Sequence, residues 1–212
     1  MVVKLEKKIN YLKERLDLEN LPGWEAQKKM AAIPINTFTE NFFLNPKDYK
    51  KAGVAIILFN CDEKLKFYLT KRSNDLEHHK GQISFPGGSI DNKESILMAA
   101  AREAEEEIGV QRHQIEYIGS LSPLYIPVSG FKIFPSVWFA SVKPRVKLNP
   151  KEVSDIFEIE FDEVLNEEIV SQKKITLNSK NFNAPAFQFK DCLVWGATAM
   201  ILSELKEILR EI

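Results

Sequence analysis

The segment from Gly88 to Val110 constrains this chain more than any other part of its sequence, and it reads Gly-x5-Glu-x7-Arg-Glu-Ala-x-Glu-Glu-x-Gly-Val. The preceding Phe-Pro dipeptide and the pair Gly87-Gly88 predict a sharp turn at the end of an apolar run. The run from Lys93 to Ile108 is rich in Ala, Glu and Leu and predicts a helix. Gly109 would end that helix in a left-handed conformation.

Side-chain chemistry predicts how this helix begins and which face it buries. Asp91 and Glu94 have the Asp-x-x-Glu spacing of a helix entrance, in which one side chain caps the helix and the other reaches back. Small residues at Ala99 and Ala100 would leave room for a substrate. An apolar stripe at helical spacing would pack on the core and consists of Leu97, Ala101, Ala104 and Ile108.

Three glutamates, Glu103, Glu106 and Glu107, share one face of the predicted helix because they are three and four residues apart. Like charges at these spacings repel, and the last turn of a helix favours cations instead. Arg102 offsets only part of this repulsion. A divalent cation would resolve the conflict, because hard ions such as Mg²⁺ prefer carboxylate oxygens. A bare run of glutamates favours a solvated surface helix, whereas the full pattern of fixed positions favours a metal site.

The segment resembles the Nudix box, and every fixed position from Gly88 to Val110 matches. Ala104 stands where the family usually has a larger aliphatic residue. The resemblance implies an α/β fold, a Nudix-type α/β/α sandwich with a mixed sheet. It also implies an enzyme that hydrolyses a nucleoside diphosphate linked to another moiety and uses Mg²⁺ or Mn²⁺ as its cofactor.

The resemblance assigns roles to residues by their position in the box. Glu103 and Glu107 would hold metal, and Glu106 would be a further metal ligand or the catalytic residue that helps to activate water. Arg102 would orient the glutamates. Many Nudix enzymes bring a glutamate from a later loop to the metals, so Glu152 is a further catalytic candidate, with a capping or surface role as its alternative.

A second resemblance narrows the substrate. Leu69-Thr70-Lys71-Arg72-Ser73 and the stretch from Gly81 to Gly88 resemble the extra signature of the coenzyme A pyrophosphatase branch of Nudix enzymes. Those enzymes cut the diphosphate of coenzyme A or its derivatives to give 3′,5′-ADP and 4′-phosphopantetheine, or its acyl form. Glu77 stands where the signature commonly has Arg, which reverses the charge at that position.

Substrate contacts are expected around this signature. The predicted substrate-binding residues are Lys71, Arg72, Gly87 and Gly88. Tyr125 and Phe131 are candidates for an aromatic stack on adenine. For each of these side chains, an ordinary strand or loop position is the alternative.

Three functions stay open at this point. The first is a metal-dependent pyrophosphatase of the coenzyme A branch. The second is a Nudix hydrolase for ADP-ribose, a dinucleotide or another nucleoside diphosphate derivative, and Glu77 keeps it open. The third is a nucleotide-binding regulator that has the fold without the chemistry; the complete set of Glu103, Glu106 and Glu107 argues against it.

Composition limits the partners and the compartment. The chain has 212 residues and a net charge of −1, which gives no basic footprint for a long nucleic acid but allows a small anionic ligand. Only Cys61 and Cys192 are present, so a reducing compartment is expected. No apolar run approaches the ~20 residues of a membrane span and the start lacks a secretory pattern, so we expect a cytoplasmic protein without membrane contact.

The predicted organisation is an N-terminal helical extension over residues 1–45, followed by a Nudix hydrolase domain over 46–212. Helices are expected at Val2–Leu18, Trp24–Met30 and Trp195–Ile212. Strands are expected at Ala52–Phe59, Leu65–Leu69, Ile115–Ser120, Ile133–Val142 and Ile156–Phe161, with a late hairpin from Lys173–Leu177 and Ala186–Phe189. The extension would cover the core, bear on substrate or form a homodimer contact.

Overall fold

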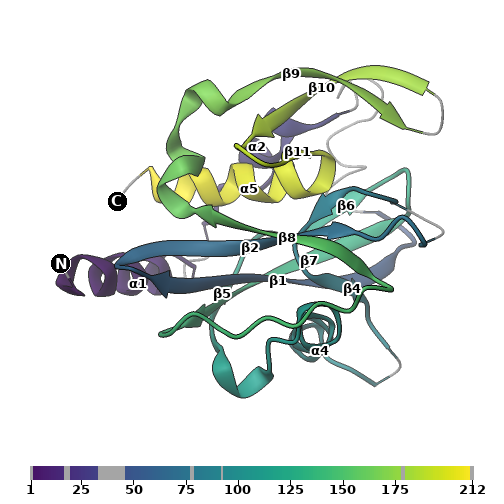
Figure 1. Ribbon diagram of the computed structural model, residues 1–212. Helices are drawn as coiled ribbons and strands as arrows, with labels where there is room; N and C mark the ends of the chain where they lie inside the picture. The colour runs from purple at the N-terminus through teal and green to yellow at the C-terminus, as the bar shows by residue number, and fades with distance from the viewer. Residues whose placement is uncertain are drawn as a thin grey trace.

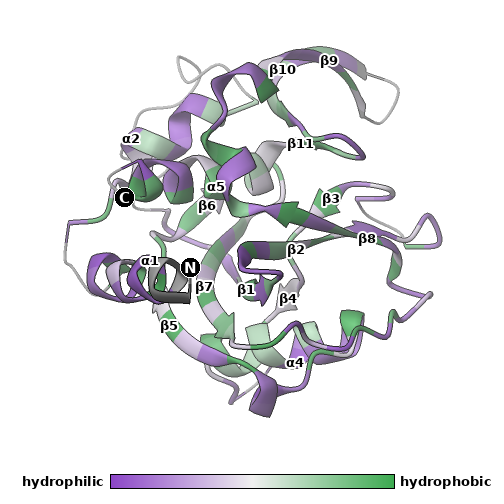
Figure 2. Cartoon of the chain, turned by 60° about the vertical axis from the view of Figure 1, so that its left-hand side comes forward, coloured by the Kyte–Doolittle hydropathy of each residue, from purple (hydrophilic) through white to green (hydrophobic). Residues whose placement is uncertain are grey.

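The protein forms an α/β/α sandwich with a mixed sheet, as the sequence predicts (Figure 1). The architecture is taken from a computed structural model, in which the structure describes residues 2–16, 20–32, 46–76, 79–91, 93–177 and 180–210. Helices α4 (Ile96–Ile108) and α5 (Gly196–Leu209) cover opposite faces of the main sheet (Figures 1 and 2). None of the helices in the described residues is long and apolar enough to cross a membrane.

Strand β1 (Lys50–Cys61) is the centre of the main sheet. It runs parallel to β7 (Phe131–Ala140) over its first ten residues and antiparallel to β2 (Lys64–Arg72) near its end. The β1–β2 hairpin turns at Asp62 and Glu63, which both have positive φ, the conformation of a turn that matches strand twist. β1 and β7 begin at the same end of the sheet, and β2 ends there.

The remaining strands extend this framework. The main sheet also contains β3 (Ile83–Ser84), β4 (Gly87–Ser89), β5 (Glu116–Ser120), β6 (Leu124–Ile126) and β8 (Val153–Glu160). A separate three-stranded sheet consists of β9 (Val170–Leu177), β10 (Lys180–Gln188) and β11 (Leu193–Trp195). Short 3₁₀ helices are η1 (Lys28–Met30), η3 (Arg112–Gln114), η4 (Phe161–Leu165) and η5 (Glu167–Ile169).

The alternation of side chains along β1 creates two hydrophobic cores, one on each face. Ile56 and Leu58 belong to the core on the α5 side, whereas Ile57 and Phe59 belong to the core on the α4 side. All four side chains are fully buried. A strand that is hydrophobic on both faces must be covered on both, which is why helices lie above and below it.

The N-terminal helices α1 (Val2–Leu16) and α2 (Gly23–Gln27) contribute to the core on the α5 side. Leu12 and Leu16 of α1 and Trp24 of α2 are buried in it. The predicted boundary between residues 45 and 46 follows a stretch outside the described residues, so the division into an extension and a domain stays a prediction.

The predicted start of the helix at Lys93 is wrong by three residues. Lys93 has φ +72°, which a right-handed helix does not allow, and α4 begins at Ile96. Ser95 is the cap, and its side chain accepts a hydrogen bond from the Met98 N–H. Asp91 and Glu94 do interact, but they form a turn before the helix. The predicted left-handed end at Gly109 is confirmed, with φ +73°.

Two further expectations about the box are wrong. Gly87-Gly88 is part of a short strand, because β4 pairs antiparallel with Ala52–Val54 of β1. Glycine is needed there for close approach: a Cβ on Gly87 would lie 2.5 Å from the Gly53 carbonyl oxygen. Ala99 and Ala100 are fully buried and leave no room for a substrate, since α4 packs directly on Gly53.

A buried carboxylate joins the N-terminal helices to the rest of the fold. Glu204 of α5 is fully buried and accepts hydrogen bonds from the backbone N–H groups of Gly23 and Ser122, both at 3.1 Å. Its second oxygen accepts from the Gln27 side chain at 2.9 Å. α2, α5 and the loop before β6 therefore meet at one side chain.

We expect Glu204→Leu to lower the free energy of unfolding by about 2–4 kcal/mol, because one buried and two partly buried hydrogen bonds lose their acceptor. Urea unfolding of the two proteins measures this difference. Glu204→Gln is the matched control, since it keeps one carbonyl acceptor and should lose less. A loss of under about 0.5 kcal/mol for Glu204→Leu would contradict this account of the junction.

Candidate active site

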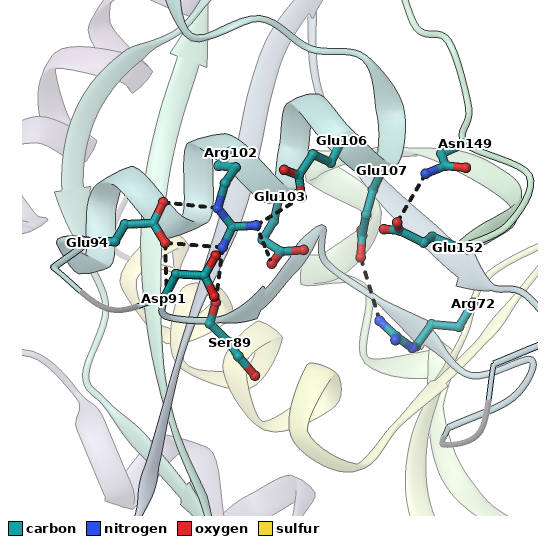
Figure 3. Close-up of polar contacts among 10 residues, drawn as sticks. All are labelled: Arg72, Ser89, Asp91, Glu94, Arg102, Glu103, Glu106, Glu107, Asn149 and Glu152. Carbon is teal, nitrogen blue, oxygen red and sulfur yellow. Dashed lines mark hydrogen bonds and ion pairs between the residues drawn. The ribbon is translucent and has the colours of Figure 1, made fainter.

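Three carboxylates, those of Glu103, Glu107 and Glu152, come together at one point between α4 and the loop that precedes β8 (Figure 3). One oxygen of each lies within 4.8 Å of the others. Glu103 and Glu107 are one helical turn apart on α4, whereas Glu152 arrives from a distant part of the sequence. This is the only group of three or more such ligands within 4.8 Å that the described residues contain.

Glu107 is the most deeply buried of the three, with 3% of its surface exposed. Burial raises the pKa of its carboxyl to about 8, and the charges of Glu103 and Glu152 add to this increase. Arg72 at the end of β2 opposes the increase in pKa, with its Nη1 3.6 Å from Glu107 Oε1, as does a hydrogen bond from the Gly87 backbone. Glu107 Oε2 is buried and has no hydrogen-bond partner.

Glu103 lies directly above Gly88 of β4. A Cβ on Gly88 would lie 2.4 Å from Glu103 Oε1, so only glycine lets this carboxylate approach the strand. Burial also raises the pKa of Glu103. The Arg102 guanidinium opposes that increase, while Glu106 and Glu152 add to it.

Arg102 connects the helix to the turn and the strand that precede it (Figure 3). Its Nη1 donates to Glu103 Oε1 and to Glu106 Oε2, both at 2.9 Å. Its Nε and Nη2 hold the carboxylate of Glu94 at 3.0 and 3.1 Å, and Nη2 also donates to the carbonyl oxygen of Ser89 at 3.1 Å. Arg102 therefore orients Glu103 with geometry that a single point charge could not provide.

Glu152 is held by three hydrogen bonds, one of which its own N–H donates to the Asn149 carbonyl oxygen at 3.0 Å. Its Oε1 accepts a hydrogen bond from the Asn149 side chain at 3.1 Å, and its carbonyl oxygen accepts from the Ser73 N–H at 2.8 Å. The Asn149 N–H in turn donates to the carbonyl oxygen of Glu107 at 2.9 Å. Sequence reasoning did not find Asn149, although its Asn-x-x-Glu spacing to Glu152 is a local signal for such a contact.

The structure does not bring Glu106 into the carboxylate cluster. Half of its side chain is exposed, at 50%, and its carboxylate is bonded to Arg102. Of the four glutamates considered as metal ligands or catalytic residues, only Glu103, Glu107 and Glu152 are brought together. The assignment of Glu106 as a metal ligand or water-activating residue stays a prediction.

Three of the residues predicted to bind substrate, Arg72, Gly87 and Gly88, border the cluster. Arg72 contacts Glu107, and Gly87 and Gly88 lie beneath the two α4 glutamates. Lys71 precedes Arg72 on β2. The stacking candidates Tyr125 and Phe131 lie on β6 and at the start of β7. Glu77, the departure from the upstream signature, is outside the described residues.

The cluster has the donors that a hard divalent cation requires. Its ligands are all carboxylate oxygens, and one of them, Glu107 Oε2, is buried without any partner. A buried acceptor of this kind costs free energy unless something binds it. Glu103, Glu107 and Glu152 therefore fit a divalent metal.

A profile of the NUDIX domain matches residues 49–179, which is more than half of the chain. The chain belongs to the Nudix family. This Nudix hydrolase is 30% identical over 183 residues to the uncharacterized Nudix hydrolase NudL of Photorhabdus laumondii, covering 82% of this chain and 97% of that protein.

Solved structures show the same fold. The Nudix hydrolase RenU from M. smegmatis has a TM-score of 0.55 and 15% identity, and the match covers 78% of this chain and 88% of RenU. The NUDIX domain of Shewanella oneidensis NrtR, solved in complex with ADP ribose, has a TM-score of 0.50 and 18% identity, covering 82% and 98% of the two chains. These structures show the fold, whereas the family match and the relatives make the protein a Nudix hydrolase, a family that acts on small nucleoside diphosphate substrates with divalent metal ions.

The raised pKa of Glu107 predicts a pH-dependent stability of the metal-free enzyme. In the folded protein the Glu107 carboxyl has a pKa of about 8, whereas the ordinary pKa of a glutamate side chain, which applies to the unfolded state, is 4.5. Between these values the unfolded state binds fewer protons, so this group's contribution to stability is full below pH 4.5 and is lost as the pH rises toward 8.

Glu107→Gln has no proton to lose. We expect its free energy of unfolding, relative to the wild type, to increase by about 3–5 kcal/mol as the pH rises from 4 to 9. Urea unfolding in the presence of EDTA across this range measures the difference. A difference that stays constant with pH would contradict a buried, protonated Glu107.

We expect Gly88→Ala to weaken the binding of Mn²⁺ at least about tenfold, because the new methyl group displaces the Glu103 carboxylate. Stability should change little, since the displaced atoms are the end of a flexible side chain. Titration followed by Mn²⁺ electron spin resonance measures the affinity, and Ser89→Ala is the control at the neighbouring exposed position. Equal affinities in the wild type and Gly88→Ala would contradict the placement of Glu103 as a ligand.

Proposed function

We propose that this Nudix hydrolase is a pyrophosphatase that hydrolyses the diphosphate of coenzyme A or its acyl derivatives to 3′,5′-ADP and 4′-phosphopantetheine, or the acyl form, with Mg²⁺ or Mn²⁺. The observation that carries the proposal is the position of the upstream signature. Its Arg72 contacts Glu107, and its closing Gly87 and Gly88 lie against the two α4 glutamates. Both ends of the upstream signature therefore border the carboxylate cluster, Arg72 as a residue of the branch signature and Gly87-Gly88 where this signature runs into the Nudix box.

The negative charge of the diphosphate and of its transition state explains this arrangement. A diphosphate repels an anionic nucleophile, and negative charge spreads over the oxygens around phosphorus in the transition state. When bound by Glu103, Glu107 and Glu152, a divalent cation would polarise a phosphoryl oxygen and make water more acidic. The protein supplies positioning and a preorganised field around that reaction.

Individual residues contribute to that positioning. Arg102 fixes the Glu103 carboxylate, and Asn149 fixes that of Glu152. Arg72 brings a positive charge to the same point, with a buried Nε that has no hydrogen-bond partner and could donate to a phosphate. The water-activating role of Glu106 belongs to this proposal, as do the cytoplasmic location and a homodimer.

The second candidate is hydrolysis of ADP-ribose, a dinucleotide or another nucleoside diphosphate derivative. Glu77 in the upstream signature favours it, because a carboxylate replaces the expected arginine there. The fold similarity to the NrtR domain, which was solved with ADP ribose, is consistent with it. A nucleotide-binding regulator without catalysis is less favoured, because the donor set for a metal is complete.

The test is product analysis by mass spectrometry after incubation with coenzyme A and Mg²⁺. We expect 3′,5′-ADP and 4′-phosphopantetheine from the wild type, and none from Glu107→Gln as the blank. Intact coenzyme A would overturn the substrate assignment, and the same assay with ADP-ribose and dinucleotides would then identify the second candidate. No product from any of these substrates would favour the regulator.

We expect Glu107→Gln and Glu152→Gln to lower kcat at least about a hundredfold, because each removes a ligand of the proposed metal. Glu105→Gln is the matched control. It makes the same charge change on an exposed side chain of the same helix and should keep kcat within about twofold. Near-wild-type turnover by folded Glu152→Gln would remove Glu152 from the site.

A further inference from the structure

A group of lysines and aromatic rings, which we call the basic rim, lies where β1 and β7 begin. Its members are Tyr49, Lys50, Lys51, Phe131 and Lys132. Lys50 Nζ lies 5.9 Å from the centre of the Phe131 ring, and Lys132 Nζ lies 5.2 Å from that of Tyr49. Because side chains alternate along a strand, Lys51 and Lys132 leave one face of the sheet, and Lys132 lies beside Tyr49 there, whereas Lys50 leaves the other face beside Phe131.

The lysines of the rim have no acidic partner among the residues that the structure describes. Lys51 and Lys132 are direct partners in the parallel pairing of β1 with β7, so their Cα atoms are about 5 Å apart and their side chains leave the same face. Like charges placed opposite each other destabilise a sheet. No ion pair among the described residues involves Lys50, Lys51 or Lys132, whereas Lys64 and Lys143, at the opposite end of the sheet, each pair with a glutamate. A bound anion would relieve the repulsion between Lys51 and Lys132.

The rim lies next to the carboxylate cluster. Gly53 is two residues beyond Lys51 on β1 and pairs with Gly88, the residue beneath Glu103. At about 3.3 Å per residue, Lys51 is roughly 7 Å from Gly53 along the strand. The Lys51 carbonyl oxygen accepts a hydrogen bond at 3.1 Å from the N–H of Ile90, immediately after β4. A group on the same nucleotide as a diphosphate at the cluster can reach this distance.

We propose that the basic rim binds a phosphate monoester of the substrate, remote from the diphosphate that is cleaved. The ammonium groups of Lys51 and Lys132 hold the phosphate, and Lys50 adds to the local positive potential. This inference rests on the proposed function for its substrate, where the monoester is the 3′-phosphate of coenzyme A. It makes that phosphate a determinant of specificity, because ADP-ribose carries no monoester.

A small ligand suits the rim better than a nucleic acid does. The two ammonium groups of Lys51 and Lys132 match the charge of about −2 on one phosphate monoester, and the chain as a whole has a net charge of −1. Phosphate contacts by lysine need no fixed direction, since an ammonium group is a point charge with three donors. Arg72, the nearest arginine of the upstream signature, is already engaged with Glu107.

The test compares kcat/KM for coenzyme A and 3′-dephospho-coenzyme A in the wild type and in the double variant Lys51→Gln/Lys132→Gln. We expect the wild type to prefer coenzyme A at least about tenfold and the double variant to lose this preference, with kcat/KM for the dephospho form unchanged within about twofold. Lys173→Gln/Lys174→Gln on β9 makes the same charge change elsewhere and should keep the preference.

Each other outcome has a defined meaning. Equal kcat/KM for both substrates in the wild type would contradict binding of the 3′-phosphate by the rim. An equal loss for both substrates in the double variant would also contradict it. Either result leaves the proposed pyrophosphatase activity unaffected. If neither compound is cleaved, coenzyme A is not the substrate. The affinities for 3′,5′-ADP and 5′-AMP, measured by calorimetry, then test whether the rim binds a phosphate monoester. Tighter binding of 3′,5′-ADP that depends on Lys51 and Lys132 supports it, and equal affinities overturn it.

Discussion

Mutual repulsion among three carboxylates within 4.8 Å is the constraint around which this enzyme is built. The free energy cost is largest at Glu107, whose pKa rises to about 8 in its buried position. The surroundings offset part of it: Arg102 binds Glu103, Asn149 binds Glu152, and Arg72 lies beside Glu107. Glycines at positions 87 and 88 let the helix, the strand and the carboxylates approach each other. The remaining unsatisfied oxygen of Glu107 is what a divalent cation would bind.

The fold supplies the rigidity that such a cluster requires. β1 is covered on both faces, so its partners β4 and β7 and the helix α4 are fixed by packing as well as by hydrogen bonds. Carboxylates that repel each other hold their positions only if the backbone beneath them cannot relax. Glu204 serves the opposite face in a similar way, since it ties α2 and the loop before β6 to α5. Charged groups inside this protein are therefore placed by neutral or cationic donors from several elements.

The proposed activity and the proposed basic rim divide the recognition of one substrate between two places. The cluster and Arg72 would act on the diphosphate, which nearly all substrates of the family share. The rim would act on a group that only some of them carry. Because Lys51 is at the start of β1 and the cluster is near Gly53 of the same strand, a single rigid element sets the spacing between the two.

Local chemistry in the sequence determined the helix of the box, its end at Gly109 and the shared face of Glu103 and Glu107. It also determined most strands. These features depend on residues that are close together in the chain. It was wrong about the helix start, where Ser95 caps in place of Asp91, and about Gly87-Gly88, which pair as a strand. Only the tertiary structure decided that Glu152 joins the cluster while Glu106 turns to Arg102. It alone also placed Lys51 beside Lys132. These choices depend on contacts between residues far apart in sequence, which no spacing along the chain can encode.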